Sequence, residues 1–480
     1  MERRKVGVGA SFLVVGNAVS SILKFLSIPI LARQLTPEDF GAAGVALAIS
    51  SLGLILAGRS GLGTCVVNFQ NERKVFDDTI FWIGLALGLI LMVLFLVGAG
   101  SLAVLFGSRN ATDLILVISI IFPMDVLSGV GYAFLLRANR YQTISAINII
   151  ASAMSIITAL LLALFGAGAW SLIAQFIVFS LVRVNSFFIL SGYRISCSFS
   201  ISAAKRIVPR ALNFTISDVF IWAANDGPIL IVSKFLGEAA AGVFRVTNRL
   251  VRLPFEIIGI QLSDAFFSGL SDRNGASSEN SDILWIQKIA ATILAPIFLG
   301  LAAVSQVATV VILGEQYKEF WVIVSLLCIA QAFNVINFGF FPYLKANAFS
   351  SFLLMMTATR AILVVLGATV GAIVFGKLWG FTCGLALSYF ITSVIYFMCF
   401  CWKSRIQPAT LFGAQVVPML GSVFMGISVF YLLDIILSEH GGFLTLLIAS
   451  TFGSVFYLAF IWIFERSLVW DLLKIVRSKR

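Results

Sequence analysis

Long apolar runs separated by short polar segments repeat along the whole chain of 480 residues. Lipid cannot satisfy exposed backbone polar groups, so a spanning segment must be a helix of about 20 mostly apolar residues or a strand of a closed barrel. The runs are continuous and lack the alternation of barrel strands, so they predict helices. The fourteen expected transmembrane helices span 8–31, 40–63, 79–106, 113–136, 144–166, 170–191, 211–235, 241–263, 285–313, 321–343, 351–375, 379–402, 411–436 and 443–464. The predicted fold class is therefore all-α and integral to a membrane.

The composition supports a membrane protein without a soluble part. Hydrophobic residues make up 60% of the chain and charged residues 11%, whereas soluble domains contain about 25% charged residues. The longest internal polar segments, 192–210 and 264–284, leave no room for a soluble catalytic domain. We therefore expect a protein that moves something across the bilayer and is not an enzyme.

Few residues are suited to metal or cofactor chemistry. The chain has one histidine, His440, and six cysteines without ligand spacing. It shows no Gly-rich phosphate loop and no nucleophile paired with a base. We expect no metal, no cofactor and no ATP hydrolysis, so that transport depends on a coupling ion, H+ or Na+, or on the gradient of the substrate itself.

The net charge of +11 is explained by membrane topology. It could indicate a nucleic-acid partner, but the basic residues lie mainly in short loops between apolar runs. With the N-terminus inside, the external loops hold only Arg33, Arg109, Lys234, Lys318 and Lys377 of the 33 Lys and Arg residues. The positive-inside rule then places both termini in the cytoplasm. The tail 465–480 is expected to form an amphipathic helix on membrane lipids, and no nucleic-acid partner is expected.

Two sequence motifs recur in order along the chain. Residues 32–35, Ala-Arg-Gln-Leu, precede Gly41, and residues 233–236, Ser-Lys-Phe-Leu, precede Gly242 at an offset of 201 residues. Residues 136–141 likewise match 344–349 at an offset of 208. The order and the similar offsets indicate duplication of a six-helix unit. Because six is even, the two copies have the same orientation, as in transporters with parallel repeats.

The duplication predicts the domain organisation. Residues 1–200 would form an N-lobe of helices 1 to 6, residues 201–405 a C-lobe of helices 7 to 12, and residues 406–480 two further helices with the cytoplasmic tail. In such transporters the substrate passes between the lobes, and rocking of one lobe against the other gives alternating access.

Polar and charged residues inside the predicted spans mark the candidate route, because ionisable groups at bilayer depth usually face a cavity or a partner. Those on helices 1, 2, 7 and 8 share helical faces and predict a hydrated, mildly cationic cavity that could bind phosphate through guanidinium groups. The residues are Asn17, Lys24, Arg59, Asp218, Trp222, Asn225, Asp226, Arg245, Arg249 and Arg252. The alternative is that pairs such as Arg252–Glu256 are structural, or that arginines reach to an interface.

Other polar and kinking residues allow two interpretations each. Trp222 could stack on a sugar ring or pack against a helix. Pro29 and Pro228 would kink helices 1 and 7 and are candidate hinges or static kinks. Arg183, Arg360 and Asp125 are interpreted as structural partners or end anchors rather than ligands.

The motif residues resemble a known family. Residues 31–41 read Leu-Ala-Arg-Gln-Leu-Thr-Pro-Glu-Asp-Phe-Gly, followed by Gly-Leu-Gly at 61–63 and Asn-Phe-Gln-Asn at 68–71. Together with the turn at 136–139, they resemble the Wzx-type polysaccharide flippases and exporters of the multidrug/oligosaccharidyl-lipid/polysaccharide exporter superfamily. The resemblance implies two six-helix lobes around a cavity lined by helices 1, 2, 7 and 8.

The resemblance also implies a cargo and a location. The expected substrate is an oligosaccharide repeat unit on undecaprenyl diphosphate, moved across the bacterial inner membrane for exopolysaccharide, capsule or O-antigen assembly. Lipid-linked oligosaccharide and membrane lipids are the expected partners, with other polysaccharide assembly proteins as further candidates.

Three other functions remain open. A peptidoglycan lipid-precursor flippase shares the expected fold and cationic cavity. A multidrug antiporter on this fold would collect cations with acidic groups, which Lys24 and Arg59 disfavour, although Asp218 and Asp226 keep an ion-coupled cycle open. A membrane-embedded polymerase or ligase would need a long external loop, and no external loop here exceeds roughly a dozen residues.

Overall fold

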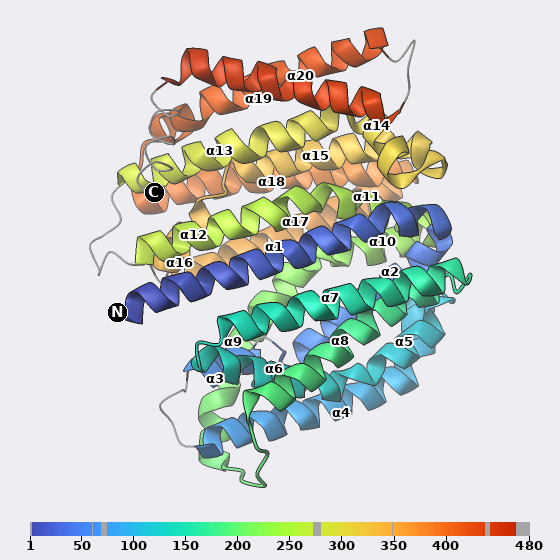
Figure 1. The fold of residues 1–480 in the computed structure, drawn as a ribbon, viewed down its shortest axis with the longest axis vertical. Helices are drawn as coiled ribbons and strands as arrows, with labels where there is room; N and C mark the ends of the chain where they lie inside the picture. The colour runs from blue at the N-terminus through green and yellow to red at the C-terminus, as the bar shows by residue number, and fades with distance from the viewer. Residues whose placement is uncertain are drawn as a thin grey trace. The chain divides into compact units, whose positions relative to one another are not determined.

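The computed structural model describes residues 2–59, 61–68, 74–271, 280–347, 349–436 and 442–466. All regular elements in these ranges are helical (Figure 1). Eleven of these helices are long and apolar enough to cross a membrane, and two further pairs qualify if each bent pair is one span. The predicted fold class, all-α and membrane-spanning, is confirmed.

The chain divides into two compact units. Unit 1 comprises 1–246 and 372–378, and unit 2 comprises 247–371 and 379–480. Unit 1 contains α1 (Glu2–Gln34), α2 (Pro37–Leu56), α3 (Gly61–Asn68), α4 (Lys74–Leu105), α5 (Ala111–Ser119), α6 (Ile121–Arg137), α7 (Tyr141–Leu164), α8 (Ala169–Ser191), α9 (Ile201–Asn225), α10 (Gly227–Leu236) and the start of α11 (Glu238–Pro254). The lobe boundaries expected from the repeat stay a prediction.

Unit 2 begins within α11 and contains the later helices. They are η1 (Phe255–Gly259), α12 (Ile260–Ser271), α13 (Asn280–Ala303), α14 (Ser305–Ala308), η2 (Thr309–Leu313), η3 (Glu315–Phe320), α15 (Trp321–Val335), α16 (Phe340–Ala346), α17 (Ser350–Phe375), α18 (Leu378–Ser404), α19 (Pro408–Ile436) and α20 (Phe443–Phe464). The predicted span 241–263 coincides with α11, η1 and α12, which are helical but are not among the helices that qualify as spans by length and composition. The exact number of fourteen stays a prediction, and the expected tail helix and His440 lie outside the described residues.

The motif at residues 36–39 starts α2 and ties it to α8. The Thr36 hydroxyl oxygen accepts a hydrogen bond from the Asp39 backbone N–H at 3.2 Å, and the Thr36 N–H donates to Asp39 Oδ2 at 3.1 Å. This capping box satisfies two backbone donors at the helix start. Asp39 Oδ1 also accepts from the backbone N–H of Ala169, at 2.9 Å, where α8 begins. The sequence motif therefore joins two helix starts, at a place that we call the Thr36 end of unit 1.

The predicted seventh span is longer than expected and broken. Its helix starts at Ile201 rather than 211, because the Ser200 hydroxyl caps it by accepting from the Ala203 N–H at 3.3 Å. α9 and α10 meet at an angle of 43° around Asp226 and Gly227, and Pro228 occupies the first turn of α10. Proline suits a first turn because it has no N–H to leave unpaired. Pro29, by contrast, lies within the continuous α1. The hinge role of both prolines stays a prediction.

A buried aspartate holds the irregular segment between α8 and α9. Asp78 accepts hydrogen bonds from the hydroxyls of Tyr193 at 2.6 Å and Ser198 at 2.5 Å, and from Ser196. Burial and the bond to Asp78 raise the pKa of Tyr193 above its ordinary value, so the phenol stays a donor. Trp82 Nε1 donates to the Ser196 carbonyl at 3.0 Å. These contacts fasten 192–200 to the start of α4.

Asp78→Ala is expected to release this segment, because three hydroxyls lose their charged acceptor, and hydrogen bonds to charged groups contribute about 1.5–3 kcal/mol each. Arg194 is exposed within the segment, so trypsin should cut there several-fold faster in the purified variant. Asp113→Ala, at an exposed aspartate of α5, is the matched control. An unchanged cleavage rate at Arg194 would contradict the proposed role of Asp78.

Unit 2 is organised around α13. Its fully buried Gln287 donates through Nε2 to the carbonyls of Val335 and Ile336, at 2.7 Å each, and accepts from the Gly339 N–H at 2.8 Å. One side chain therefore satisfies the backbone groups at the break between α15 and α16. α13 also packs along α19, and α19 along α20 (Figure 1). The two helices beyond the predicted lobes are thus an integral part of this unit.

Candidate functional site

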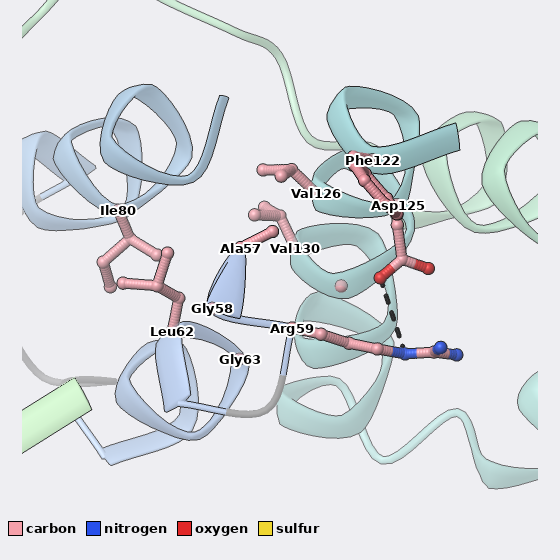
Figure 2. Close-up of a pocket in the computed structure, with 11 residues that line it drawn as sticks. Ala57, Gly58, Arg59, Leu62, Gly63, Ile80, Phe122, Asp125, Val126 and Val130 are labelled. Atoms are coloured by element: carbon pink, nitrogen blue, oxygen red, sulfur yellow. Dashed lines mark ion pairs between the residues drawn. The ribbon is translucent and has the colours of Figure 1, made fainter. Parts of the chain in front are cut away.

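The first candidate site is a cavity of about 440 Å³ in unit 1. We call it the Arg59 cavity. Arg59 lies in the turn after α2, where Gly58 adopts a positive φ of 88°, inside the candidate span Pro37–Val66. Its Nε atom lies 3.4 Å from Asp125 Oδ2 of α6, and the exposed fractions of the two side chains are 39% and 8%. Figure 2 shows this pair beside a smaller hollow that Leu62 and Val126 help to line. A buried carboxylate thus faces a partly exposed guanidinium.

Arg183 of α8 lines the same cavity. Its guanidinium carbon lies 5.3 Å and 5.2 Å from the ring centroids of Phe179 and Phe187, one turn to either side on α8. The ammonium of Lys24 in α1 lies 4.5 Å from the Phe179 centroid. Such cation–π contacts stabilise buried cations. The structure therefore gathers three cations in this part of unit 1, and only Lys24 and Arg59 were predicted site residues.

The remaining predicted residues of unit 1 lie on α1 and around the α9–α10 break. Asn17 is exposed on α1, Asp218 and Asn225 are half-buried on α9, and Asp226 is exposed at the break. The break ends α9 at Asn225, so the expected continuous helical stripe stops there. None of these four lines the Arg59 cavity.

Trp222 is tied to α2. Its Nε1 donates to the Ala48 carbonyl and to the Ser51 hydroxyl, at 3.0 Å each. A tryptophan N–H normally finds such a partner when it leaves water. The contacts give the indole a packing role between helices, and stacking on a sugar stays a prediction.

The stripe on α11 crosses the boundary between the units. Arg245 belongs to unit 1, where its side chain lies beside Gly44 of α2. Arg249 and Arg252 are half-buried in unit 2. Arg252 Nε lies 3.8 Å from Glu256 Oε1, which is in the π-helical turn η1. This pair, which the sequence analysis weighed as a structural alternative, is present. Whether these arginines line a substrate route stays a prediction.

The second candidate site is an apolar groove of about 600 Å³ in unit 2. α13, α19 and α20 form most of its wall, through Leu301, Met425, Leu446, Ala449 and Leu458 among others. The sequence pattern of α19 and α20 alone indicates no role for them. The groove shows that they, together with α13, enclose space suited to an apolar chain.

The Thr36 end of unit 1 is closed by backbone contact. A Cβ atom added at Gly41 of α2 would collide with the Glu238 carbonyl, and one added at Gly242 of α11 would collide with the Pro37 carbonyl. Small residues allow such close helix approach. Glu238 also accepts hydrogen bonds from the Ser108 hydroxyl at 2.6 Å and Asn110 Nδ2 at 3.0 Å. The two glycines identified as equivalent in the sequence repeat therefore meet each other.

The sequence interpretation missed Asp125, Arg183 and the groove. Asp125 and Arg183 carried a signal, as charges inside predicted spans, but hydropathy does not show which spans are neighbours. Among the described residues, no group of three or more His, Cys, Asp or Glu side chains could hold a metal ion.

Comparison with known proteins gives the family and the fold. The model of the polysaccharide biosynthesis protein family matches residues 30–322. The succinoglycan biosynthesis transport protein ExoT of Rhizobium meliloti is 28% identical over 469 residues, covering 95% of this chain and 93% of that protein. The lipid II flippase MurJ, in an inward closed conformation, superposes with a TM-score of 0.76 at 16% identity, covering 95% of this chain and 99% of that chain. An inward-facing MATE multidrug transporter gives 0.62 at 18% identity, covering 82% and 95%.

The structural likenesses confirm the multidrug-exporter-like fold. The family match and the similarity to a transport protein confirm the expectation of a membrane transporter rather than an enzyme. Because the family model matches well over half of the chain, this chain belongs to the polysaccharide biosynthesis protein family.

Proposed function

We propose that this protein moves a lipid-linked oligosaccharide repeat unit across the bacterial inner membrane for the assembly of surface polysaccharide, such as exopolysaccharide, capsule or O-antigen. The observation that carries the proposal is the family match over residues 30–322. The similarity to ExoT, a succinoglycan biosynthesis transport protein, extends over nearly the whole chain and supports it.

The proposed carrier is undecaprenyl diphosphate, and the apolar groove supports a lipid-linked cargo. A polyprenyl tail must stay out of water while its polar head crosses the bilayer. A groove between α13, α19 and α20 could accommodate part of that tail. The polar head would then use Arg59 and the arginines of α11, because guanidinium groups bind phosphate oxygens bidentately.

The proposed cycle is alternating access of two lobes, with both termini in the cytoplasm. The chain lacks a nucleotide-binding motif, so the proposed driving force is an H+ or Na+ gradient or the gradient of substrate. In the proposed topology the Thr36 end lies outside. The contact between Gly41 and Gly242 would then keep the route closed to the outside in this conformation.

A peptidoglycan lipid-precursor flippase is the second candidate, favoured by the likeness to MurJ. Deletion of the gene distinguishes the two. A strain that grows normally but lacks surface polysaccharide, restored by the plasmid-borne gene, supports the proposal. Loss of viability with lysis would instead support the precursor flippase. Unchanged growth together with unchanged polysaccharide would contradict both.

Arg249→Ala and Arg252→Ala are each expected to lower polysaccharide export, because they remove cationic groups proposed to meet the anionic head of the substrate. Loss of a hydrogen bond to a charged group corresponds to about a tenfold or larger effect. The measurement is surface polysaccharide per cell at equal membrane levels of the protein. Lys377→Ala, in the exposed turn between α17 and α18, is the control. Wild-type export in both variants would show that Arg249 and Arg252 do not contribute to the substrate route.

A further inference from the structure

The Arg59 cavity has charged lining residues besides Arg59 that the proposed route does not use. It lies within unit 1, between the turn after α2 and the helices α6 and α8. Asp125, Tyr132 and Arg183 line it together with Arg59. At about 440 Å³, it has room for a group much larger than a single water molecule.

Arg183 is held ready to bind within this cavity. Its guanidinium lies over the rings of both Phe179 and Phe187. Within the described part of the chain, its buried Nε–H has no hydrogen-bond partner. Leaving a buried donor unpaired costs about 1–3 kcal/mol. Arg137 and Arg360 also have an unpartnered buried Nε–H, and Arg183 differs from them because it lines the Arg59 cavity.

The charge balance of the cavity favours an anion. Asp125 is the only carboxylate among its described lining residues, and it lies 3.4 Å from the Nε atom of Arg59. Two guanidinium groups therefore face one carboxylate. A cationic ligand would meet repulsion here, whereas an oxyanion would add the missing negative charge.

We propose that the Arg59 cavity binds an oxyanion of the cargo, either a carboxylate on a sugar or a phosphoryl group of the carrier. Arg183 is its anchor, and Asp125 is the counter-ion that holds Arg59 in place until the anion arrives. The proposal rests on the proposed function and adds Arg183, Asp125 and Tyr132 to the residues that meet the substrate.

The chain offers a matched control for Arg183. Arg360 of α17 also has a buried Nε–H without a hydrogen-bond partner in the described part of the chain. Its guanidinium lies 5.1 Å from the ring centroid of Tyr389. It lines neither the Arg59 cavity nor the apolar groove. The two arginines therefore share their packing and differ in their access to a cavity.

The test is ligand binding by the purified full-length protein. Sodium glucuronate, sodium diphosphate and neutral glucose are titrated against wild type, Arg183→Gln and Arg360→Gln. We expect wild type and Arg360→Gln to bind at least one of the two anions saturably and glucose not at all. Arg183→Gln should bind that anion at least about tenfold more weakly, the loss expected for a hydrogen bond to a charged group. Preference for glucuronate assigns the site to a sugar carboxylate, and preference for diphosphate assigns it to the carrier.

A second variant keeps the proposal testable if Arg183→Gln does not fold. Arg183→Lys retains the charge but loses the planar fork of donors, so it should bind the anion more weakly than wild type. The proposal is overturned if wild type binds neither anion, if the Arg183 variants keep wild-type affinity, or if Arg360→Gln loses as much. Binding is measured without export, so its failure leaves the deletion test of the proposed function unaffected.

Discussion

Gly242→Val is expected to abolish export, because its side chain would collide with the backbone at the start of α2. The nearest atom to an added Cβ is the carbonyl oxygen of Pro37, which cannot rotate away as a flexible side chain could. Overpacking of this kind costs about 3 kcal/mol or more. At about 1.4 kcal/mol per tenfold, the closed arrangement of the Thr36 end would be depopulated by roughly a hundredfold.

Two measurements separate a failure to close from a failure to fold. Surface polysaccharide reports export, and a cysteine at buried Ser233 of α10, in a background without native cysteines, reports closure. A membrane-impermeant thiol reagent should not react with the cysteine of the Ser233→Cys variant. It should react when Gly242→Val is added to that variant, because the thiol is then exposed. Gly98→Val is the control, because nothing lies within 4 Å of a Cβ added there. Normal export by Gly242→Val, with an unreactive cysteine, would show that this contact is not a gate.

Gly242 also shows how much of the fold could be predicted from the sequence. The repeat identified Gly41 and Gly242 as equivalent, and apolar runs located most of the spans. Neither observation showed that the two glycines touch each other, because a repeat relates positions by rotation and says nothing of contact. The structure supplies the reason for their small size, which is the close approach of two backbones.

The elements that the sequence misplaced are those where local chemistry overrides hydropathy. Ser200 starts α9 ten residues before the apolar run begins, and the break at Asp226 divides what looked like one span. A hydropathy value is an average over the residues of one helical turn or more. It therefore does not reveal a single capping residue or a helix break.

The candidate site was the least predictable part. Helical periodicity places side chains on a face, but the rotation of each helix within the bundle comes from packing. Asp125 and Arg183 were therefore interpreted as anchors, although they line one cavity with Arg59. The apolar groove likewise depends on α13 meeting α19 and α20, which follow it at a distance in the chain, and each of the three alone looks like an ordinary span.

Arg137→Met is expected to cause the largest loss of stability among single substitutions in unit 1. Arg137 ends α6 and binds both carboxylate oxygens of Asp77, at 2.9 Å each, with exposed fractions of 15% and 10% for the two side chains. It also donates to the Val66 carbonyl of α3. Removing one partner leaves a buried charge without compensation, which costs about 3–5 kcal/mol. The measurement is the free energy of unfolding in detergent micelles.

The net contribution of the ion pair to stability differs from the cost of removing one of its two charges. A double variant measures the two separately. Asp77→Leu combined with Arg137→Met removes both charges, so most of the lost stability should return, because well-packed apolar residues often replace a buried pair without loss. Lys345→Met tests the equivalent position of the repeat, where the ammonium lies 5.2 Å from the Phe267 ring centroid. Such a contact contributes about 0.5–1 kcal/mol, so that variant should change little. Equal losses in Arg137→Met and in the double variant would show that the lost hydrogen bond to Val66, and not the stranded aspartate, sets the cost.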